Sequence, residues 1–281
     1  MTPASFEAFA SLLKRGSGLI VGPEKQYLLE ARLGPILTRL GLKGLDELAA
    51  RLRSSEMELG ELERQVVEAM TTNESFFFRD DRPFAHFRTT ALPKLVASRP
   101  AGARIRIWSA AASSGQEAYS LAMIMAEASS MLAGRAVEIL GTDISREQLT
   151  RAKEGLYTQF EVQRGLPIQN LVRHFRKDGT GWRISDTLRG MVTFREWNLL
   201  SDLRPLGTFD IVFCRNVLIY FDGPTKTRVL NALAAQMAPD GLLYLGGAET
   251  VIGITSRFGV APGERGVYEV APAGGMALAG R

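Results

Sequence analysis

Small and polar residues follow an apolar run near the middle of the chain. The run "IRIW" at 105–108 leads into "SAAASSGQE", Ser109 to Glu117, where a helical pattern begins. Side chains this small let a ligand lie close to the backbone. The stretch has one glycine, Gly115, and lacks the GxGxxG fingerprint on which a pyrophosphate rests. The sequence therefore disfavours a dinucleotide and leaves a smaller, nucleoside-like ligand open.

An acid ends the next apolar run. Asp143 closes "AVEILGTD" and lies 28 residues after Gly115. A carboxylate at this point of a nucleotide-binding sheet accepts hydrogen bonds from ribose hydroxyls. Asp143 could instead be the N-cap of the helix predicted from Arg146, a role that Ser145 can also fill.

Two later runs end in asparagine. "MVTFREWNL" reaches Asn198 and Leu199, and "FDIVFCRNVLIYFD" has Arg215 and Asn216 directly after its apolar core. An asparagine beyond a strand is often only a turn residue. Two such residues on successive strands favour a ligand shared between the strand ends.

These polar residues need a sheet to bring them together. From about Arg104 on, short apolar runs alternate with helical spacing, which predicts a parallel sheet covered by helices. Ligands of such sheets lie beyond the carboxyl ends of the strands. Residues 155–190 interrupt the alternation and predict an inserted subdomain. The predicted strands are 105–108, 136–143, 191–199, 209–214 and 241–247, and the predicted helices are 117–130, 146–154 and 224–237.

The first hundred residues follow helical spacing instead. An apolar stripe from Phe6 to Leu13 ends at "GSG", and a second stripe from Leu28 to Leu40 ends at Gly41. These stripes predict a small helical domain ahead of the sheet.

The composition of the 281 residues excludes several classes of protein. One cysteine, Cys214, and two histidines, His86 and His174, cannot make a Cys/His metal cluster. No apolar run approaches the roughly 20 residues of a membrane span, and the N-terminus lacks a basic-then-apolar leader pattern. We therefore expect a cytoplasmic protein without a metal and without membrane insertion.

Positive charge is concentrated in one segment. Residues 146–195 have 10 Lys and Arg against 5 Asp and Glu, whereas residues 1–90 have 12 against 13. Such an excess suits an acidic partner, and a solvated face without a partner explains it equally well.

The stretch "TTNESFFFRD", Thr71 to Asp80, places three phenylalanines between a polar run and a charged cluster. Together with "WSAAASSGQEAYSLAM", "GTDIS", "WNLL" and "FDIVFCRNVLIYFD", it resembles the CheR family of chemotaxis protein-glutamate O-methyltransferases. The motifs occur in the order and at about the spacing of that family, and the likeness covers residues 5 to 271.

The resemblance implies an α/β fold. Its centre would be a doubly wound, mostly parallel sheet of the class I methyltransferase type, with an N-terminal all-helical domain and a small inserted β-subdomain. The expected boundaries are 1–75 for the helical domain, 76–100 for a linker, 101–271 for the methyltransferase domain, about 155–190 for the insert, and 272–281 for a disordered tail.

The resemblance also implies the cofactor S-adenosylmethionine, with S-adenosylhomocysteine as product and no metal. Glu117 and Asp143 would hold its amino acid and ribose parts, and the phenylalanines 76–78 would only pack. The other expected cofactor contacts are Asn73, Ser75, Arg79, Asn198, Leu199, Arg215 and Asn216. The chain departs from the usual family residues at Ser75 (threonine), Gln116 (an acid) and Ala118 (proline).

The implied reaction is methyl transfer to glutamate side chains of chemoreceptors. A glutamate with a pKa of about 4.3 is ionised at neutral pH, so it needs no general base. The expected catalytic residues are Arg79, which would reach the carboxylate or the cofactor, and Tyr220, whose hydroxyl would orient an acceptor oxygen. Tyr220 could instead anchor the following helix, and Arg79 could only pair with Asp80 or Asp81.

The implied partner is the helical cytoplasmic domain of a chemoreceptor, which would recruit the enzyme to membrane-bound receptor arrays. Two basic sets could dock it, and in some family members the inserted β-subdomain also holds a peptide from the receptor C-terminus. The N-terminal set is Lys14, Arg15, Arg32, Arg39, Arg51 and Arg53, and the set in the insert is Arg164, Arg173, Arg176 and Lys177.

Three other functions compete with this one. A methyltransferase acting on RNA or a small molecule would keep the fold, but the sequence has no NPPY-type motif, no RGG segment and no recognisable RNA module, so no nucleic-acid partner is expected. A non-catalytic regulator that binds S-adenosylmethionine is the second alternative. A nicotinamide dehydrogenase is the third, and the missing glycine fingerprint disfavours it.

Overall fold

The computed structural model describes residues 1–52 and 60–272. By their internal contacts, these residues form two compact units: Met1–Thr72 with Tyr220–Thr225 (unit 1), and Asn73–Ile219 with the residues from Lys226 onward (unit 2). Arg53 and residues 273–281 of the predicted tail lie outside the described residues. The domain boundaries given above stay predictions.

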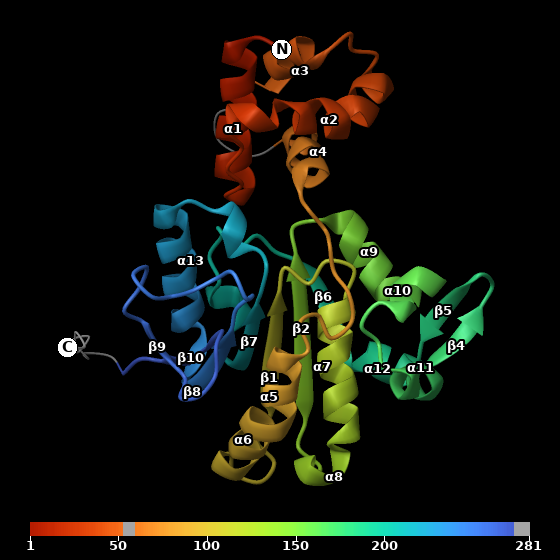
Figure 1. Ribbon diagram of the computed structural model, residues 1–281, viewed down its shortest axis with the longest axis vertical. Helices are drawn as coiled ribbons and strands as arrows, with labels where there is room; N and C mark the ends of the chain where they lie inside the picture. Colours follow the sequence, from red (N-terminus) through yellow and green to blue (C-terminus); the bar gives the residue numbers. More distant parts are fainter. Residues whose placement is uncertain (53–59, 273–281) are drawn as a thin grey trace. The chain divides into compact units, whose positions relative to one another are not determined.

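Unit 1 is helical, as predicted. In the first stripe Phe6, Phe9 and Leu13 are buried, and in the second Leu29, Leu33 and Ile36 are buried. Both stripes end at a glycine in the left-handed region, which glycine adopts without steric cost, with φ of 78° at Gly18 and 64° at Gly41. Its elements are α1 (Pro3–Ser17), η1 (Pro23–Lys25), α2 (Gln26–Leu40), α3 (Leu45–Leu52) and α4 (Glu61–Met70) (Figure 1).

A seven-stranded sheet forms the centre of unit 2, in the order β6-β2-β1-β7-β8-β10-β9 (Figure 1). Its strands are β1 (Ile105–Ala110), β2 (Val137–Asp143), β6 (Val192–Glu196), β7 (Phe209–Cys214), β8 (Met237–Tyr244), β9 (Phe258–Val260) and β10 (Val267–Val270). The first five are parallel, and β10 runs antiparallel to β8 and β9. Strand order reverses between β1 and β7, so the topological switch point lies there. The predicted doubly wound, mostly parallel sheet is confirmed.

The structure differs from the predicted elements at three places. The sequence does not predict β9 and β10, because strands of three and four residues are too short to show alternation. The strand predicted at 241–247 begins at Met237 and ends at Tyr244, and the helix predicted at 117–130 divides at Ala128.

The residues predicted as a linker pack into the core of unit 2. They form the continuous helical elements α5 (Arg82–His86), η2 (Phe87–Ala91) and α6 (Leu92–Ser98). The ring of Phe84 stacks on Phe213 of β7 at 5.5 Å, and Phe213 stacks on Tyr244 of β8 at 4.3 Å. The other helical elements of the chain are α7 (Gln116–Glu127), α8 (Ser129–Leu132), α9 (Arg146–Glu154), η3 (Arg204–Leu206), η4 (Leu218–Tyr220) and α13 (Gly223–Ala235).

The predicted insert is a small antiparallel sheet with helices around it. Its strands β3 (Leu156–Tyr157), β4 (Phe175–Asp178) and β5 (Gly181–Ile184) lie in the order β3-β5-β4. Its helices are α10 (Gln159–Gln163), α11 (Ile168–His174) and α12 (Asp186–Met191), and α12 leads back to β6 (Figure 1).

The three consecutive phenylalanines diverge. Phe77 packs edge-on against two rings of the insert, Tyr157 at 5.0 Å and Phe175 at 5.6 Å. Phe78 packs against Phe84 at 5.4 Å, inside the main core. Phe76 is half-buried, so the predicted packing role describes Phe77 and Phe78 better than Phe76.

Candidate active site

Strained backbone gathers at the carboxyl ends of β1 and β7. Ala111 and Ser113 have φ of 62° and 50° in the loop after β1, and Asn216 has φ of 59° after β7. Such left-handed residues cost about 1–3 kcal/mol each and are typical of ligand sites. They lie at the switch point, where open α/β sheets bind ligands. This region is therefore the candidate site.

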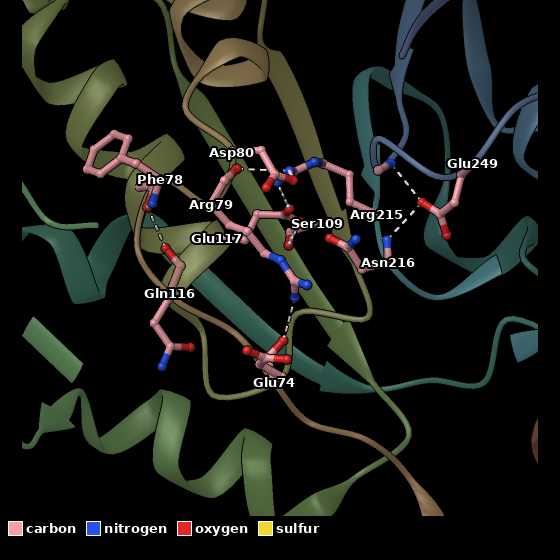
Figure 2. A network of polar contacts seen from close by, with 12 residues as sticks. Glu74, Phe78, Arg79, Asp80, Ser109, Gln116, Glu117, Arg215, Asn216 and Glu249 are labelled. Atoms are coloured by element: carbon pink, nitrogen blue, oxygen red, sulfur yellow. Dashed lines mark hydrogen bonds and ion pairs between the residues drawn. The ribbon is translucent and has the colours of Figure 1, made fainter. Parts of the chain in front are cut away.

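Arg215 is the buried centre of an ion-pair network (Figure 2). Its side chain is 1% exposed, and its Nη1 lies 3.2 Å from Oε2 of Glu117. Its Nη2 donates to Oδ2 of Asp80 at 2.6 Å and to the carbonyl oxygen of Arg79 at 2.8 Å. Ser109 completes the network by donating to Oε1 of Glu117 at 2.7 Å. The pair of Arg215 with Glu117 is buried, so removing one of these two partners should be strongly destabilising. Asp80 is 51% exposed, and its bond to Nη2 together with that of the Arg79 carbonyl oxygen holds the 79–80 segment to the end of β7.

Glu117 lies in the first turn of α7 and is largely buried, with a side chain 13% exposed. Burial raises the pKa of its carboxyl, while the Arg215 guanidinium and the Ser109 hydroxyl oppose that shift. A carboxylate desolvated in this way gains much from an additional cationic neighbour. Next to it Gln116, 1% exposed, accepts a hydrogen bond from Oγ of Ser114 at 3.0 Å.

Asp143 organises the two loops beside it. Its Oδ2 accepts from the backbone N–H of Ser113 at 2.8 Å, and its Oδ1 accepts from that of Ser145 at 2.9 Å. The N-cap of α9 is Ser145, whose Oγ accepts from Gln148 N–H at 3.1 Å. The alternative of Asp143 as that N-cap is therefore wrong.

The segment 73–79 lies against the same loops. Oγ of Ser113 donates to the carbonyl oxygen of Asn73 at 3.0 Å, and Ser75 is half-buried. Nη1 of Arg79 donates to the carbonyl oxygen of Glu74 at 2.8 Å, and Figure 2 shows its guanidinium directed toward Glu74. The carboxylate of Asp80 pairs with Arg215, and among the described residues no ion pair joins Arg79 to Asp80 or Asp81.

The turn after β6 joins the site through Asp143. The N–H of Trp197 donates to the carbonyl oxygen of Asp143 at 2.9 Å. Oδ1 of Asn198 accepts from Leu200 N–H at 2.9 Å, which is the turn role considered for asparagine, and Leu199 is half-buried. Tyr220 falls in the segment that groups with unit 1, and its role stays a prediction.

Sequence reasoning missed Glu249. This carboxylate is buried and accepts five backbone N–H groups. Oε2 accepts from Asn216 at 2.8 Å and from Gly246 at 2.7 Å, and Oε1 accepts from Val217 at 2.9 Å, Leu218 at 2.7 Å and Ile219 at 3.3 Å. Figure 2 shows it beside Asn216. The rule that drew attention to Asp143, an acid just beyond a strand, applies equally to "GGAET" after β8 and would have found it.

The described residues contain neither a cluster of metal-binding side chains nor a helix that could cross a membrane. No group of three or more His, Cys, Asp and Glu side chains in residues 1–52 and 60–272 could hold a metal ion. Within the same ranges, no helix is both long and apolar enough to span a bilayer.

Two domain families match consecutive parts of the chain. The family described as "CheR methyltransferase, SAM binding domain" matches residues 73–267, and "CheR methyltransferase, all-alpha domain" matches residues 4–71. The chain belongs to the CheR methyltransferase family. It is therefore a methyltransferase that uses S-adenosylmethionine, and the resemblance stated from the motifs is confirmed.

Similar proteins cover nearly the whole chain. Chemotaxis protein methyltransferase Cher2 of Pseudomonas putida is 40% identical over 257 residues, which are 90% of this chain and 92% of that protein. Chemotaxis protein methyltransferase 1 of Pseudomonas aeruginosa is 40% identical over 259 residues, 91% and 93% of the two chains. Chemotaxis protein methyltransferase 1 of Vibrio cholerae is 39% identical over 257 residues, 90% and 91%. The family places this methyltransferase in chemotaxis.

The site fits the family's cofactor chemically. A buried carboxylate at Glu117 suits a ligand ammonium, and the acid at the end of β2 suits ribose hydroxyls. The strained loop after β1 contacts the second of these carboxylates, since the N–H of Ser113 lies 2.8 Å from Oδ2 of Asp143.

Proposed function

We propose that this protein methylates glutamate side chains of chemoreceptors, the methyl-accepting chemotaxis proteins, to give glutamate 5-O-methyl esters. The match of both CheR domain families carries the proposal, together with relatives that are named chemotaxis protein methyltransferases. In this proposal the enzyme is cytoplasmic and is recruited to receptor arrays.

We assign the cofactor contacts to residues around the switch point. Glu117 binds the ammonium of the methionine part, and Asp143 binds the ribose hydroxyls. Arg215 holds Glu117 in place, since its Nη1 lies 3.2 Å from that carboxylate. The other proposed contacts are Asn73, Ser75, Arg79, Asn198, Leu199 and Asn216.

When bound, S-adenosylmethionine supplies a methyl group that its sulfonium already activates. The protein's task is then to align an acceptor that is already an anion, and such alignment lowers barriers by on the order of 7–11 kcal/mol. We propose that Arg79 holds the acceptor carboxylate. Among the described residues it donates to one carbonyl oxygen, that of Glu74, and a guanidinium has five N–H donors. Tyr220 is the proposed second orienting group.

A labelling experiment tests this function. The purified protein is incubated with S-adenosylmethionine labelled in its methyl group and with receptor-bearing membranes, and labelled material is treated with mild alkali. We expect label on the receptor band that alkali releases as methanol, because carboxyl methyl esters are base-labile. Alkali-stable label on RNA or on a small molecule would identify that molecule as the methyl acceptor in place of glutamate. Cofactor binding without any label would indicate a non-catalytic regulator.

The pKa of Glu117 gives a second prediction. Its folded pKa is raised by burial, so protonation begins at a higher pH than for an ordinary glutamate. An ammonium ligand needs the ionised form. The Kd for S-adenosylhomocysteine should therefore rise as the pH falls through that elevated pKa, by up to about tenfold per pH unit for one proton. Calorimetric titration across pH checks this.

Glu117→Gln is the matched variant for the pH prediction. It should bind more weakly and lose the pH dependence in that range, because the amide has no proton to gain. A wild-type Kd that stays constant from neutral pH down to about pH 4.5 would refute the ammonium contact.

The insert supports receptor docking better than the N-terminal basic set does. In unit 1, Lys14 pairs with Asp222 at 2.8 Å, and Arg32 donates to the carbonyl oxygens of Met70 and Thr71. In the insert, β4 is the last strand of its sheet and carries the exposed residues Arg176 and Lys177. A receptor peptide can add to such an edge as a further strand. We therefore propose that the insert takes an acidic receptor segment.

A further inference from the structure

Two consecutive residues of the insert, Arg164 and Gly165, contact the segment that carries Arg79. Nη2 of Arg164 lies 2.5 Å from Oε1 of Glu74, and its guanidinium carbon lies 4.3 Å from the centre of the Phe76 ring. The guanidinium carbon of Arg79 lies 5.4 Å from the same ring, and its Nη1 donates to the Glu74 carbonyl oxygen. Arg164 and Arg79 therefore share two neighbours, one on each side of Ser75.

Gly165 brings the two backbones together. Its φ is 81°, and a Cβ at this position would lie 2.1 Å from the carbonyl oxygen of Phe77. No side chain fits there, so the turn after α10 lies directly on the 74–77 segment. The ring of Phe77 adds edge-on contacts to Tyr157 and Phe175 of the insert. The segment is thus fixed to the insert by its backbone, one ring and one ion pair.

The ion pair between Arg164 and Glu74 contributes little to stability. Their side chains are 41% and 53% exposed, and exposed pairs are usually weak. The hydrogen bond from Arg164 lowers the pKa of Glu74, so this carboxylate is ionised at neutral pH, as the ion pair requires. We therefore expect the Arg164–Glu74 contact to affect the position of the groups around Arg79 more than the stability of the fold.

We propose that Arg164 is a positioning residue for methyl transfer: by holding Glu74 and Phe76, it sets where the guanidinium of Arg79 lies. The proposal rests on the proposed function of Arg79. It makes the insert part of the catalytic apparatus in addition to any role in docking. Misplacing a catalytic group by 1 Å can cost about 100-fold in rate, so a modest displacement is enough to matter.

The test compares steady-state kinetics of four variants with the wild type, using a purified receptor cytoplasmic fragment. Arg164→Ala should lower kcat by about tenfold, with KM for the receptor and the melting temperature near wild type. Arg164→Lys keeps the charge and should recover most of kcat. Glu74→Ala removes one of the two contacts of Arg164 and should lower kcat no more than Arg164→Ala does. The double variant should be no worse than Arg164→Ala, because the contact to Glu74 is already absent there.

Arg189→Ala is the control. Arg189 forms a comparable exposed pair in the insert, 3.0 Å from Asp186, and no contact joins it to Glu74 or Phe76 among the described residues. It should keep the wild-type kcat.

Three results would overturn the positioning role. A normal kcat with a raised KM for the receptor would make Arg164 a docking residue only. Additive losses in the double variant would show that the two residues act separately. Equal kcat for wild type and Arg164→Ala, beside an inactive Arg79→Ala, would refute the positioning while leaving the proposed function intact. An active Arg79→Ala would instead refute the role given to Arg79 itself.

Discussion

Replacing Arg79 with alanine is expected to lower kcat for receptor methylation by on the order of 100-fold, the effect of misaligning an acceptor that Arg79 holds in place. The Kd for S-adenosylhomocysteine should change much less, because Glu117 and Asp143 remain. Arg79→Lys should fall between, since an ammonium cannot donate two parallel hydrogen bonds to a carboxylate. Single-turnover rates with saturating receptor, beside calorimetric cofactor titrations, separate these effects.

Arg82→Ala is the control for Arg79. Arg82 is nearby in the sequence, its side chain is 73% exposed, and it pairs with Glu264 at 3.6 Å. Its loss should leave kcat unchanged. If Arg79→Ala retained kcat and instead lost cofactor affinity, Arg79 would be a cofactor contact without a hold on the acceptor.

Glu249→Ala is expected to destabilise unit 2 by about 3 kcal/mol or more. The carboxylate accepts five backbone N–H groups, and leaving buried donors unpaired costs about 1–3 kcal/mol each unless water reaches them. Glu249→Gln should fall between the wild type and Glu249→Ala. Its amide keeps one accepting oxygen but turns an NH₂ group toward donors that the second oxygen served.

Denaturant unfolding followed by tryptophan fluorescence measures this loss. All three tryptophans, Trp108, Trp182 and Trp197, lie in unit 2, so the signal reports that unit. Glu269→Gln, at an exposed position on β10, should stay within about 0.5 kcal/mol of the wild type. A Glu249→Ala variant as stable as that control would show that water replaces the carboxylate at little cost.

Local patterns predict the elements and the edge of the sheet at which the site lies. Helical spacing predicts the buried Leu29, Leu33 and Ile36, and apolar runs predict β2 and β7 nearly to the residue. Because parallel strands end at a common edge, Asp143 and Arg215 are placed together from the strand ends alone. Glu249 follows the same rule, because it lies two residues beyond the strand predicted at 241–247.

Local sequence patterns do not predict which residues these side chains pair with. Arg215 pairs with Asp80, 135 residues away, and Arg164 pairs with Glu74, 90 residues away. Nothing in either neighbourhood specifies those pairs, because they depend on how the insert and the 73–81 segment pack. The same holds for the three phenylalanines at 76–78. They are consecutive in the sequence, but each one packs in different surroundings.

The strained loop after β1 also bears on how the cofactor is received. Ala111 and Ser113 are held in the left-handed region by hydrogen bonds from Ala112 N–H to Thr142 O at 2.8 Å and from Ser113 N–H to Asp143 at 2.8 Å. Flexible binding loops lose conformational freedom when a ligand binds. The loop after β1 has already lost that freedom during folding. This part of the proposed site is therefore preorganised, and we expect cofactor exchange between turnovers to proceed without refolding the loop.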